Sequence, residues 1–334
     1  MFKKFTEVEI VSTGVYTPAE VLDNATLLAE LGLDGLTPEK VLEVYGVRER
    51  RRAGAKETCA TLAARAAEQA LTTAGMTAAE VDLIFVSGVP RDAVTPPTSA
   101  IVHGILKARP GCLAVDIERA CVGWTMGLEQ SLCQLESGPE QTALVLASTV
   151  LSRGLHWPQP QYRLIFGDLG AGILLRHCAP DKGQLWYSQQ WTFGEHHDKI
   201  YFGVPWSVSP DTIPAEFHGG FYMSEKGVFF QQMQEKLAPC FEEFWTNSGL
   251  CPEDVTVALM HQPSKPLFLE GVRWSGIPLE KVHQNLERYG NVIAAELPLG
   301  LHELFQAGRI QPGDWVLMFT YGAGFTVGIT AFRY

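Results

Sequence analysis

Three side chains that lie far apart in the sequence could together perform acyl-transfer chemistry: Cys121, His261 and Asn291. Cys121 follows a predicted strand at 113–117 and precedes a predicted helix that runs to about residue 135. Unpaired backbone N–H groups and the positive end of the dipole at a helix N-terminus favour the thiolate form of a cysteine. Cys121 is therefore a candidate nucleophile, although a buried structural role is more common for this residue type.

His261 and Asn291 also lie at the ends of predicted elements. His261 follows a predicted strand at 255–260, where an open α/β sheet presents side chains to a crevice. Asn291 is predicted to open a helix, where a simple N-cap would equally account for its residue type. Together with Cys121, they place a thiol, an imidazole and an amide at the ends of predicted strands and helices.

Two glycine-rich segments have different predicted uses. Gly322-Ala323-Gly324 follows a predicted strand at 315–320 and offers backbone N–H groups with little side-chain obstruction. Such a loop can form half of an oxyanion hole, with the N–H of Cys121 as the other half, although many loops of this kind are simple turns. The segment at 166–172 is not followed by a predicted helix, so we interpret it as a structural turn and not as a dinucleotide fingerprint.

The elements that must position these residues alternate between helix and strand, which predicts an α/β fold. A predicted helix at 58–74 and a strand at 81–89 match a helix at 228–245 and a strand at 255–260. In both units, a valine that opens the strand lies six residues after a glycine.

The match continues downstream of these units. Cys121 and Asn291 each lie 17 residues before a glycine that precedes an apolar strand. Coincidence is the alternative, because a glycine followed by a strand is common. A duplicated α/β unit predicts that Cys121 and Asn291 begin equivalent helices in the two halves.

Composition excludes several classes of protein. The chain has 334 residues, 46% of them hydrophobic, which suggests an ordered globular protein of about two domains. Its net charge of -11 disfavours a nucleic-acid surface. The longest apolar stretch, 143–151, is too short to span a bilayer, so we expect a soluble cytoplasmic protein without membrane contact. The seven cysteines lack zinc-site spacing; we therefore expect no metal, and mostly reduced, buried and inert thiols.

These segments, in this order, resemble the thiolase superfamily, specifically its ketosynthase III branch, the β-ketoacyl-carrier-protein synthases III. The resemblance spans nearly the whole chain and is carried by residues 46–50, 120–123, 166–168, 261–262, 290–295 and 321–328. It implies a five-layered αβαβα fold of two pseudo-duplicated halves, 1–178 with the nucleophile and 179–334 with His261 and Asn291. It also implies a homodimer.

The resemblance also implies roles for the candidate residues. Cys121 would accept an acyl group, and the N–H groups of Cys121 and Ala323 would hold the oxyanion that forms there. His261 and Asn291 would bind the enolate oxygen of the second substrate. No cofactor is implied beyond the phosphopantetheine that carries the substrates, on an acyl carrier protein or coenzyme A.

Several positions depart from the pattern of this branch. The tryptophan and arginine that usually stack the adenine of coenzyme A are replaced by Lys40 and, approximately, Pro160. Substrate delivery by acyl carrier proteins is therefore favoured over coenzyme A. The small residues that usually precede the nucleophile are replaced by Glu118 and Arg119.

Carrier proteins are acidic, so an acidic enzyme needs a local basic patch to bind them. Lys226, Lys265 and Arg273 lie near positions that serve this purpose in the family. A run of arginines at 48–52 is a second candidate patch, with solvated charges or an interface as the alternative.

The resulting hypothesis is a stand-alone ketosynthase, an acyltransferase of class EC 2.3.1, in polyketide or fatty-acid type biosynthesis. A narrower hypothesis is a resemblance to the enzymes of antibiotic biosynthesis that join two carrier-bound β-ketoacyl chains into an α-pyrone, as in the myxopyronin and corallopyronin pathways. Two alternatives stay open: an acyltransferase that moves the acyl group to a hydroxyl or amine, and a non-catalytic ketosynthase-like partner subunit.

Overall fold

The computed structural model describes residues 1–153, 157–179, 182–203, 213–224 and 226–334, with the backbone alone for 226–232. Ten strands form one mixed sheet in the order β12-β11-β13-β14-β8-β1-β7-β6-β4-β5. One half of the sheet comprises β1 (Phe2–Tyr16), β4 (Leu83–Val89), β5 (Leu113–Asp116), β6 (Thr142–Thr149) and β7 (Leu169–His177). The other comprises β8 (Gln184–Thr192), β11 (Val257–Met260), β12 (Val282–His283), β13 (Trp315–Gly322) and β14 (Thr326–Arg333).

The two halves of the sheet repeat the same pairing pattern. In the first half, β4 pairs in parallel with β5 and β6, and β7 pairs antiparallel with β6 and β1. In the second half, β11 pairs in parallel with β12 and β13, and β14 pairs antiparallel with β13 and β8. This repeat confirms the predicted duplication.

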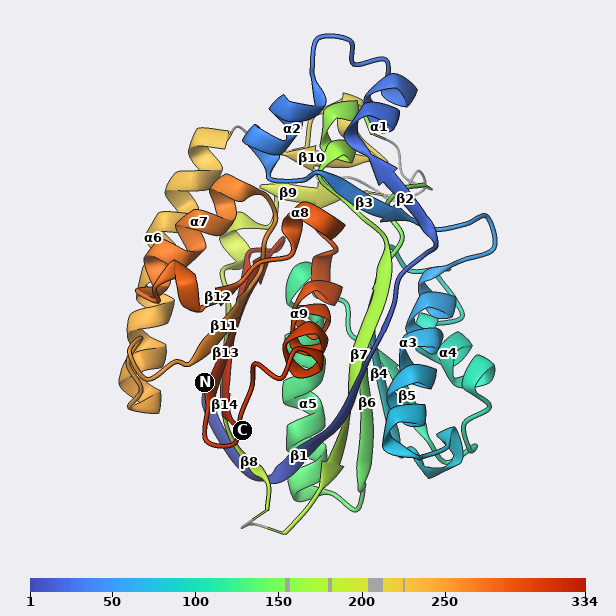
Figure 1. Cartoon of the computed structure of the whole chain (residues 1–334), viewed down its shortest axis with the longest axis vertical. Helices are drawn as coiled ribbons and strands as arrows, with labels where there is room; N and C mark the ends of the chain where they lie inside the picture. The colour runs from blue at the N-terminus through green and yellow to red at the C-terminus, as the bar shows by residue number, and fades with distance from the viewer. Residues whose placement is uncertain (154–156, 180–181, 204–212, 225) are drawn as a thin grey trace.

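Helices separate and cover the two halves of the sheet (Figure 1). Helices α5 (Gly123–Ser137) and α9 (Glu296–Gln306) lie between them, α3 (Cys59–Ala74) and α4 (Thr98–Leu106) cover one outer face, and α6 (Lys226–Ser248) and α7 (Lys265–Ser275) cover the other. The layers are those of the predicted αβαβα fold. Smaller elements cap one end of the molecule: α1 (Asn24–Leu31), α2 (Pro38–Tyr45), α8 (Leu286–Tyr289), β2 (Glu20–Asp23), β3 (Glu49–Arg52), β9 (Ile200–Phe202) and β10 (Phe221–Met223).

Helix α3 shows how local sequence sets these elements. Thr58 caps its N-terminus in a reciprocal capping box with Thr61, and Gly75 ends it with a left-handed φ of 67°. These limits match the predicted helix at 58–74. A Cβ on Gly14 of β1 would lie 2.0 Å from the Ala66 carbonyl oxygen, so glycine at this position allows the strand to contact the alanine-rich helix closely.

The two central helices bury large apolar side chains between the two halves of the sheet. On α5, Trp124, Leu128 and Leu132 are at most 1% exposed, and on α9 Leu299 and Leu301 are equally buried. Such helices belong in the interior of a protein. The segments that precede α5 and α9 therefore lie between the two halves of the sheet.

The two halves share strand β1. Its first residues pair with β8, with Phe2 opposite Gln189, and its later residues pair with β7, with Val8 opposite His177. The predicted division between residues 178 and 179 lies in the connection from β7 to β8. Because β1 pairs with β8 across this division, the five strands of each half form one continuous sheet.

Candidate active site

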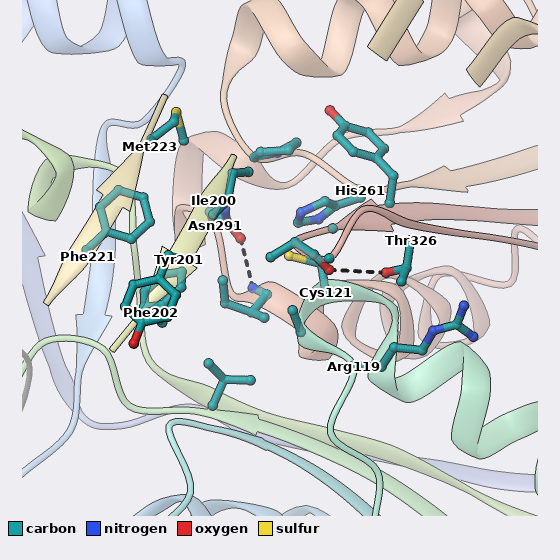
Figure 2. A pocket seen from close by; sticks show the side chains of 18 of the residues that line it. Arg119, Cys121, Ile200, Tyr201, Phe202, Phe221, Met223, His261, Asn291 and Thr326 are labelled. Carbon is teal, nitrogen blue, oxygen red and sulfur yellow. Dashed lines mark hydrogen bonds between the residues drawn. The ribbon is translucent and has the colours of Figure 1, made fainter. Parts of the chain in front are cut away.

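A cavity of about 640 Å³ brings together the four residues predicted to do chemistry: Cys121, His261, Asn291 and Ala323. We call it the central cavity. Figure 2 shows the sulfur of Cys121 beside the imidazole of His261, with Asn291 to the left of the ring. The four residues come from four separate segments of the chain, so the fold alone explains their proximity.

Cys121 lies in a one-turn 3-10 helix, η2 (Ala120–Val122), directly before α5. The prediction that Cys121 begins an α-helix is therefore wrong, because α5 begins two residues later, at Gly123. Ala120 has a φ of 45°, a conformation that costs free energy for a residue with a side chain and commonly marks a functional turn. Thr320 of β13 holds this turn by donating a hydrogen bond to the Cys121 carbonyl at 3.0 Å.

The glycine-rich loop is the tight connection between β13 and β14, and it contacts the nucleophile. A Cβ on Gly322 would lie 3.0 Å from the Cys121 Cβ and 3.1 Å from its backbone nitrogen. Any side chain at Gly322 would therefore crowd Cys121. Ala323, the next residue, lines the wall of the central cavity together with Cys121.

His261 directly follows β11 and is 2% exposed. Its Nδ1 lies 2.6 Å from the Glu296 carboxylate, which fixes the ring and leaves Nε2 for the cavity. Burial by itself lowers the pKa of His261, but the negative charges of Cys121 and Glu296, and hydrogen bonds to both, outweigh burial and raise this pKa to about 10. The imidazole is therefore a hydrogen-bond donor near neutral pH.

Asn291 is not the helix cap that its residue type would suggest. It lies two residues before η7 (Ile293–Ala295), the 3-10 turn that precedes α9, and forms an isolated bridge with Phe166. Its Oδ1 accepts a hydrogen bond from the Ile293 N–H at 2.8 Å (Figure 2). Because Oδ1 is occupied by a donor, the amide NH₂ is the group that can serve the cavity. The prediction that Asn291 opens a helix is thus wrong in register.

Glu296 is a site residue that the sequence analysis missed. It is 2% exposed and also accepts a hydrogen bond from the Gln262 N–H at 2.9 Å. The available signal was its position: one acidic residue in the otherwise apolar run 292–301. A carboxylate in such a run must find partners when the run is buried.

A second cavity, also of about 640 Å³, adjoins the first. Val89, Glu118 and Phe202 line both cavities. Arg119 is turned away from Cys121 (Figure 2), and it donates to the Trp191 carbonyl at 2.9 Å and to Thr192 Oγ1 at 2.7 Å. Arg119 therefore ties the nucleophile turn to β8, whereas Glu118 faces the cavities.

The candidate carrier-binding residues differ in their surroundings. Lys265 is exposed at the start of α7 and lines a groove of about 860 Å³ with Glu39, Glu43 and others. Arg273 is exposed on the same helix, and its guanidinium lies 3.7 Å from the Glu270 carboxylate. Lys226 begins α6, but its side chain lies outside the described residues.

The arginine run at 48–52 does not form one basic patch. Arg50 is 1% exposed and donates to the carbonyls of Leu22 and Leu164. Arg48 pairs with Glu287, and Arg52 pairs with Glu20 and Glu30. The predicted second basic patch is therefore wrong, and the alternative of solvated charges is also wrong for Arg50, which is buried.

All seven cysteines are free, but the expectation that most are buried is only partly correct. Cys59, Cys112 and Cys240 are buried, whereas Cys251 is exposed because it lies in a surface turn. Among the described residues, no helix is both long and apolar enough to cross a membrane, and no group of three potential metal ligands occurs.

Comparisons with known proteins show which family the chain resembles. The family model 3-oxoacyl-[acyl-carrier-protein (ACP)] synthase III matches residues 115–192, and its C-terminal model matches 246–334. The chain is 33% identical to the β-ketoacyl-[acyl-carrier-protein] synthase III of Granulibacter bethesdensis over 325 residues, 97% of this chain and 98% of the relative.

Solved structures show the same fold over almost the whole chain. The 3-oxoacyl-[acyl-carrier-protein] synthase III of Aquifex aeolicus superposes with a TM-score of 0.86 at 27% identity, covering 98% of this chain and 100% of that one. The Thermus thermophilus enzyme superposes with a TM-score of 0.87 at 28% identity, covering 98% and 99%. The fold is thus the thiolase fold of condensing enzymes. The chain belongs to the ketosynthase III family, whose members are acyltransferases that form carbon–carbon bonds by Claisen condensation.

Proposed function

We propose that this protein is a stand-alone ketosynthase that accepts an acyl group on Cys121 and condenses it with a second acyl thioester. The observation that carries the proposal is the meeting of Cys121, His261, Asn291 and Ala323 in one cavity, with His261 oriented by Glu296. Each of these groups has a separate task in the two half-reactions.

In the first half-reaction, the thiolate of Cys121 attacks an acyl thioester and the carrier thiol leaves. The carbonyl oxygen becomes negative in the tetrahedral intermediate. The backbone N–H groups of Cys121 and Ala323 stabilise this charge, and the close approach of Gly322 keeps the two donors together. The acyl chain then lies in the central cavity, against its apolar lining residues.

In the second half-reaction, the incoming thioester becomes an enolate. His261 donates from Nε2 and Asn291 donates from its amide NH₂ to the enolate oxygen. The α-carbon attacks the Cys121 thioester, a carbon–carbon bond forms, and the carbon–sulfur bond to Cys121 breaks. Simple acyl transfer to a hydroxyl needs only one base, so the paired donors favour condensation over that alternative.

Both substrates are proposed to arrive on acyl carrier proteins. The relatives are named as acyl-carrier-protein synthases. Lys265 and Arg273 on α7, and Lys226 on α6, are the proposed contacts for an acidic carrier. We further propose that the enzyme joins two β-ketoacyl chains, which lactonise to an α-pyrone. Two adjoining cavities of about 640 Å³ each, one for each chain, support this narrower function.

The first test is acylation followed by intact-protein mass spectrometry. Incubation with an acyl carrier thioester should add one acyl mass to the wild type and none to Cys121→Ala. The exposed Cys251→Ala variant is the matched control and should be acylated as the wild type is. An adduct on neither the wild type nor the control would support a non-catalytic subunit.

The second test is product analysis with two acyl carrier thioesters. Condensation predicts a product with a new carbon–carbon bond, and two β-ketoacyl donors should give a pyrone free of its carrier. An ester or amide without a new carbon–carbon bond would instead support the alternative acyltransferase. The same reactions with coenzyme A donors measure the preference for carrier-bound substrates.

A further inference from the structure

Glu118 lies where the central cavity and the second cavity meet. Its Oε1 accepts a hydrogen bond from the N–H of Ala120, next to the nucleophile, at 3.4 Å. Its Oε2 lies 3.9 Å from the Arg91 Nε. The carboxylate thus contacts the backbone of the residue before Cys121, lines both cavities, and is 55% exposed, so a bound substrate can reach it.

Other acidic groups nearby are already engaged. Asp92 caps α3 by accepting from Thr58 Oγ1 and from the N–H groups of Cys59 and Ala60. Asp116 accepts from the N–H groups of Thr98 and Ser99. Among the described residues that line the central cavity, Glu118 is the single carboxylate.

His261 and Asn291, the two side chains that flank Cys121 in the central cavity, act as hydrogen-bond donors and not as proton acceptors. Nδ1 of His261 faces the Glu296 carboxylate, which favours the imidazolium, and Asn291 Oδ1 is occupied by the Ile293 N–H. Acylation removes the charge of Cys121, but Glu296 remains. An enolate formed by loss of an α-proton therefore needs a base from elsewhere. Partial burial raises the pKa of Glu118, although the Ala120 N–H and Arg91 oppose the shift and the side chain keeps 55% of its exposure to solvent; a raised pKa strengthens a carboxylate base.

We propose, on the basis of the function proposed above, that Glu118 is the general base that removes the α-proton of the second acyl thioester. The C–H bond breaks, its proton moves to a Glu118 carboxylate oxygen, and its electron pair forms the enolate held by His261 and Asn291. After attack on the acyl–Cys121 carbonyl, the Cys121 thiolate leaves and the proton returns from Glu118 to solvent or to the thiolate. The condensation is thus non-decarboxylative.

This assignment defines the class of the second substrate. A β-ketoacyl thioester has an acidified α-CH₂ and no carboxylate, so it suits a carboxylate base. A malonyl-type thioester carries a negative charge that Glu118 repels at short range. Such a donor makes its carbanion by loss of CO₂ and needs no base.

That difference gives the experiment. Condensation rates are measured for the wild type, Glu118→Gln and the exposed control Glu280→Gln, each with a β-ketoacyl and with a malonyl carrier thioester. We expect Glu118→Gln to be acylated normally, to lose condensation with the β-ketoacyl donor by about 100-fold or more, and to retain or gain condensation with the malonyl donor. The control should match the wild type. Unchanged β-ketoacyl condensation, or equal loss of acylation and both condensations, would overturn the proposal.

A second measurement does not depend on bond formation. In a Cys121→Ala background, the exchange of α-protons of a butyryl carrier thioester with D₂O is followed by mass spectrometry. Cys121→Ala should catalyse exchange faster than the enzyme-free reaction, and the double variant with Glu118→Gln should not. Exchange that persists in the double variant would contradict the role of Glu118 as the base. Failure of the proposed function itself would appear differently, as a wild type without an acyl adduct and without any condensed product.

Discussion

At the scale of single residues, the site separates a nucleophile from two donors, and this separation predicts a split phenotype. His261→Ala or Asn291→Ala should leave acylation of Cys121 largely intact but lower the rate of condensation by about 100-fold, because each removes a hydrogen bond to the enolate oxygen. Single-turnover acylation and product formation measure the two steps separately. His103→Ala, at a half-buried histidine of α4 outside the central cavity, is the control.

Equal loss of acylation and condensation in the His261 and Asn291 variants would contradict these roles. It would mean that His261 acts mainly on the nucleophile. The hydrogen bond from the Ile293 N–H to Asn291 Oδ1 argues otherwise, because it leaves the amide NH₂ of Asn291 as a donor to the cavity.

Glu296 should control the protonation of His261. The pKa of His261 is raised from its ordinary 6.5 to about 10, so the imidazolium stabilises the folded protein below the ordinary pKa, and this stabilisation is lost as pH rises toward 10. In Glu296→Gln the pKa of His261 should fall. The wild type should therefore have a higher free energy of unfolding than Glu296→Gln at low pH, and this difference should decrease as the pH rises from 6.5 to about 10.

NMR titration of the His261 ring nitrogens and denaturant unfolding at several pH values check this prediction. Glu303→Gln is the matched control, because Glu303 pairs with His283 at 2.8 Å outside the central cavity. A His261 titration that is the same in Glu296→Gln and in the wild type would contradict the assignment.

At the scale of elements, the β13–β14 turn sets the distance between the two oxyanion donors. Gly322→Ala places a methyl group 3.0 Å from the Cys121 Cβ, which forces the turn or the cysteine to move. We expect acylation to slow by about tenfold or more, because misplacement of an oxyanion donor is costly. Gly35→Ala is the control, since a Cβ there meets nothing within 4 Å. Acylation at the wild-type rate in Gly322→Ala would show that the turn tolerates this shift.

The sequence predicted the elements well where local signals suffice. Thr58 and Gly75 mark the ends of α3, and the apolar runs that became β4, β6 and β13 were each located to within a few residues. The register of Cys121 and Asn291 was missed because the 3-10 turns before α5 and α9 depend on positive φ at Ala120 and Ile293, which neither residue type indicates. The contact of His261 with Glu296 joins residues 35 positions apart, and only the folded sheet brings them together.

At the scale of the whole molecule, one edge of the sheet suggests how the proposed homodimer forms. Strand β5 is a terminal strand of the ten-stranded sheet, and its Leu113 is 51% exposed. Val94 and Ile105, 65% and 39% exposed, lie in neighbouring segments. An exposed strand edge with apolar side chains is a natural pairing surface for a second copy.

We therefore expect Leu113→Lys to weaken the dimer. Light scattering of the wild type should give twice the chain mass of 36.8 kDa, and the variant should shift toward the monomer. Leu279→Lys, at an exposed leucine elsewhere, should leave the mass unchanged. A monomeric wild type would contradict the homodimer, and a dimeric variant would move the interface away from β5.

Strand β1 has a consequence for synthesis on the ribosome. It is translated first, but its two partners come much later in the chain: β7 begins at residue 169 and β8 at residue 184. The nascent strand must stay unpaired while α3, β4 and α5 emerge, and its long-range pairing is slow to form. During translation, residues 2–16 can therefore complete their pairing only after β8 has left the exit tunnel.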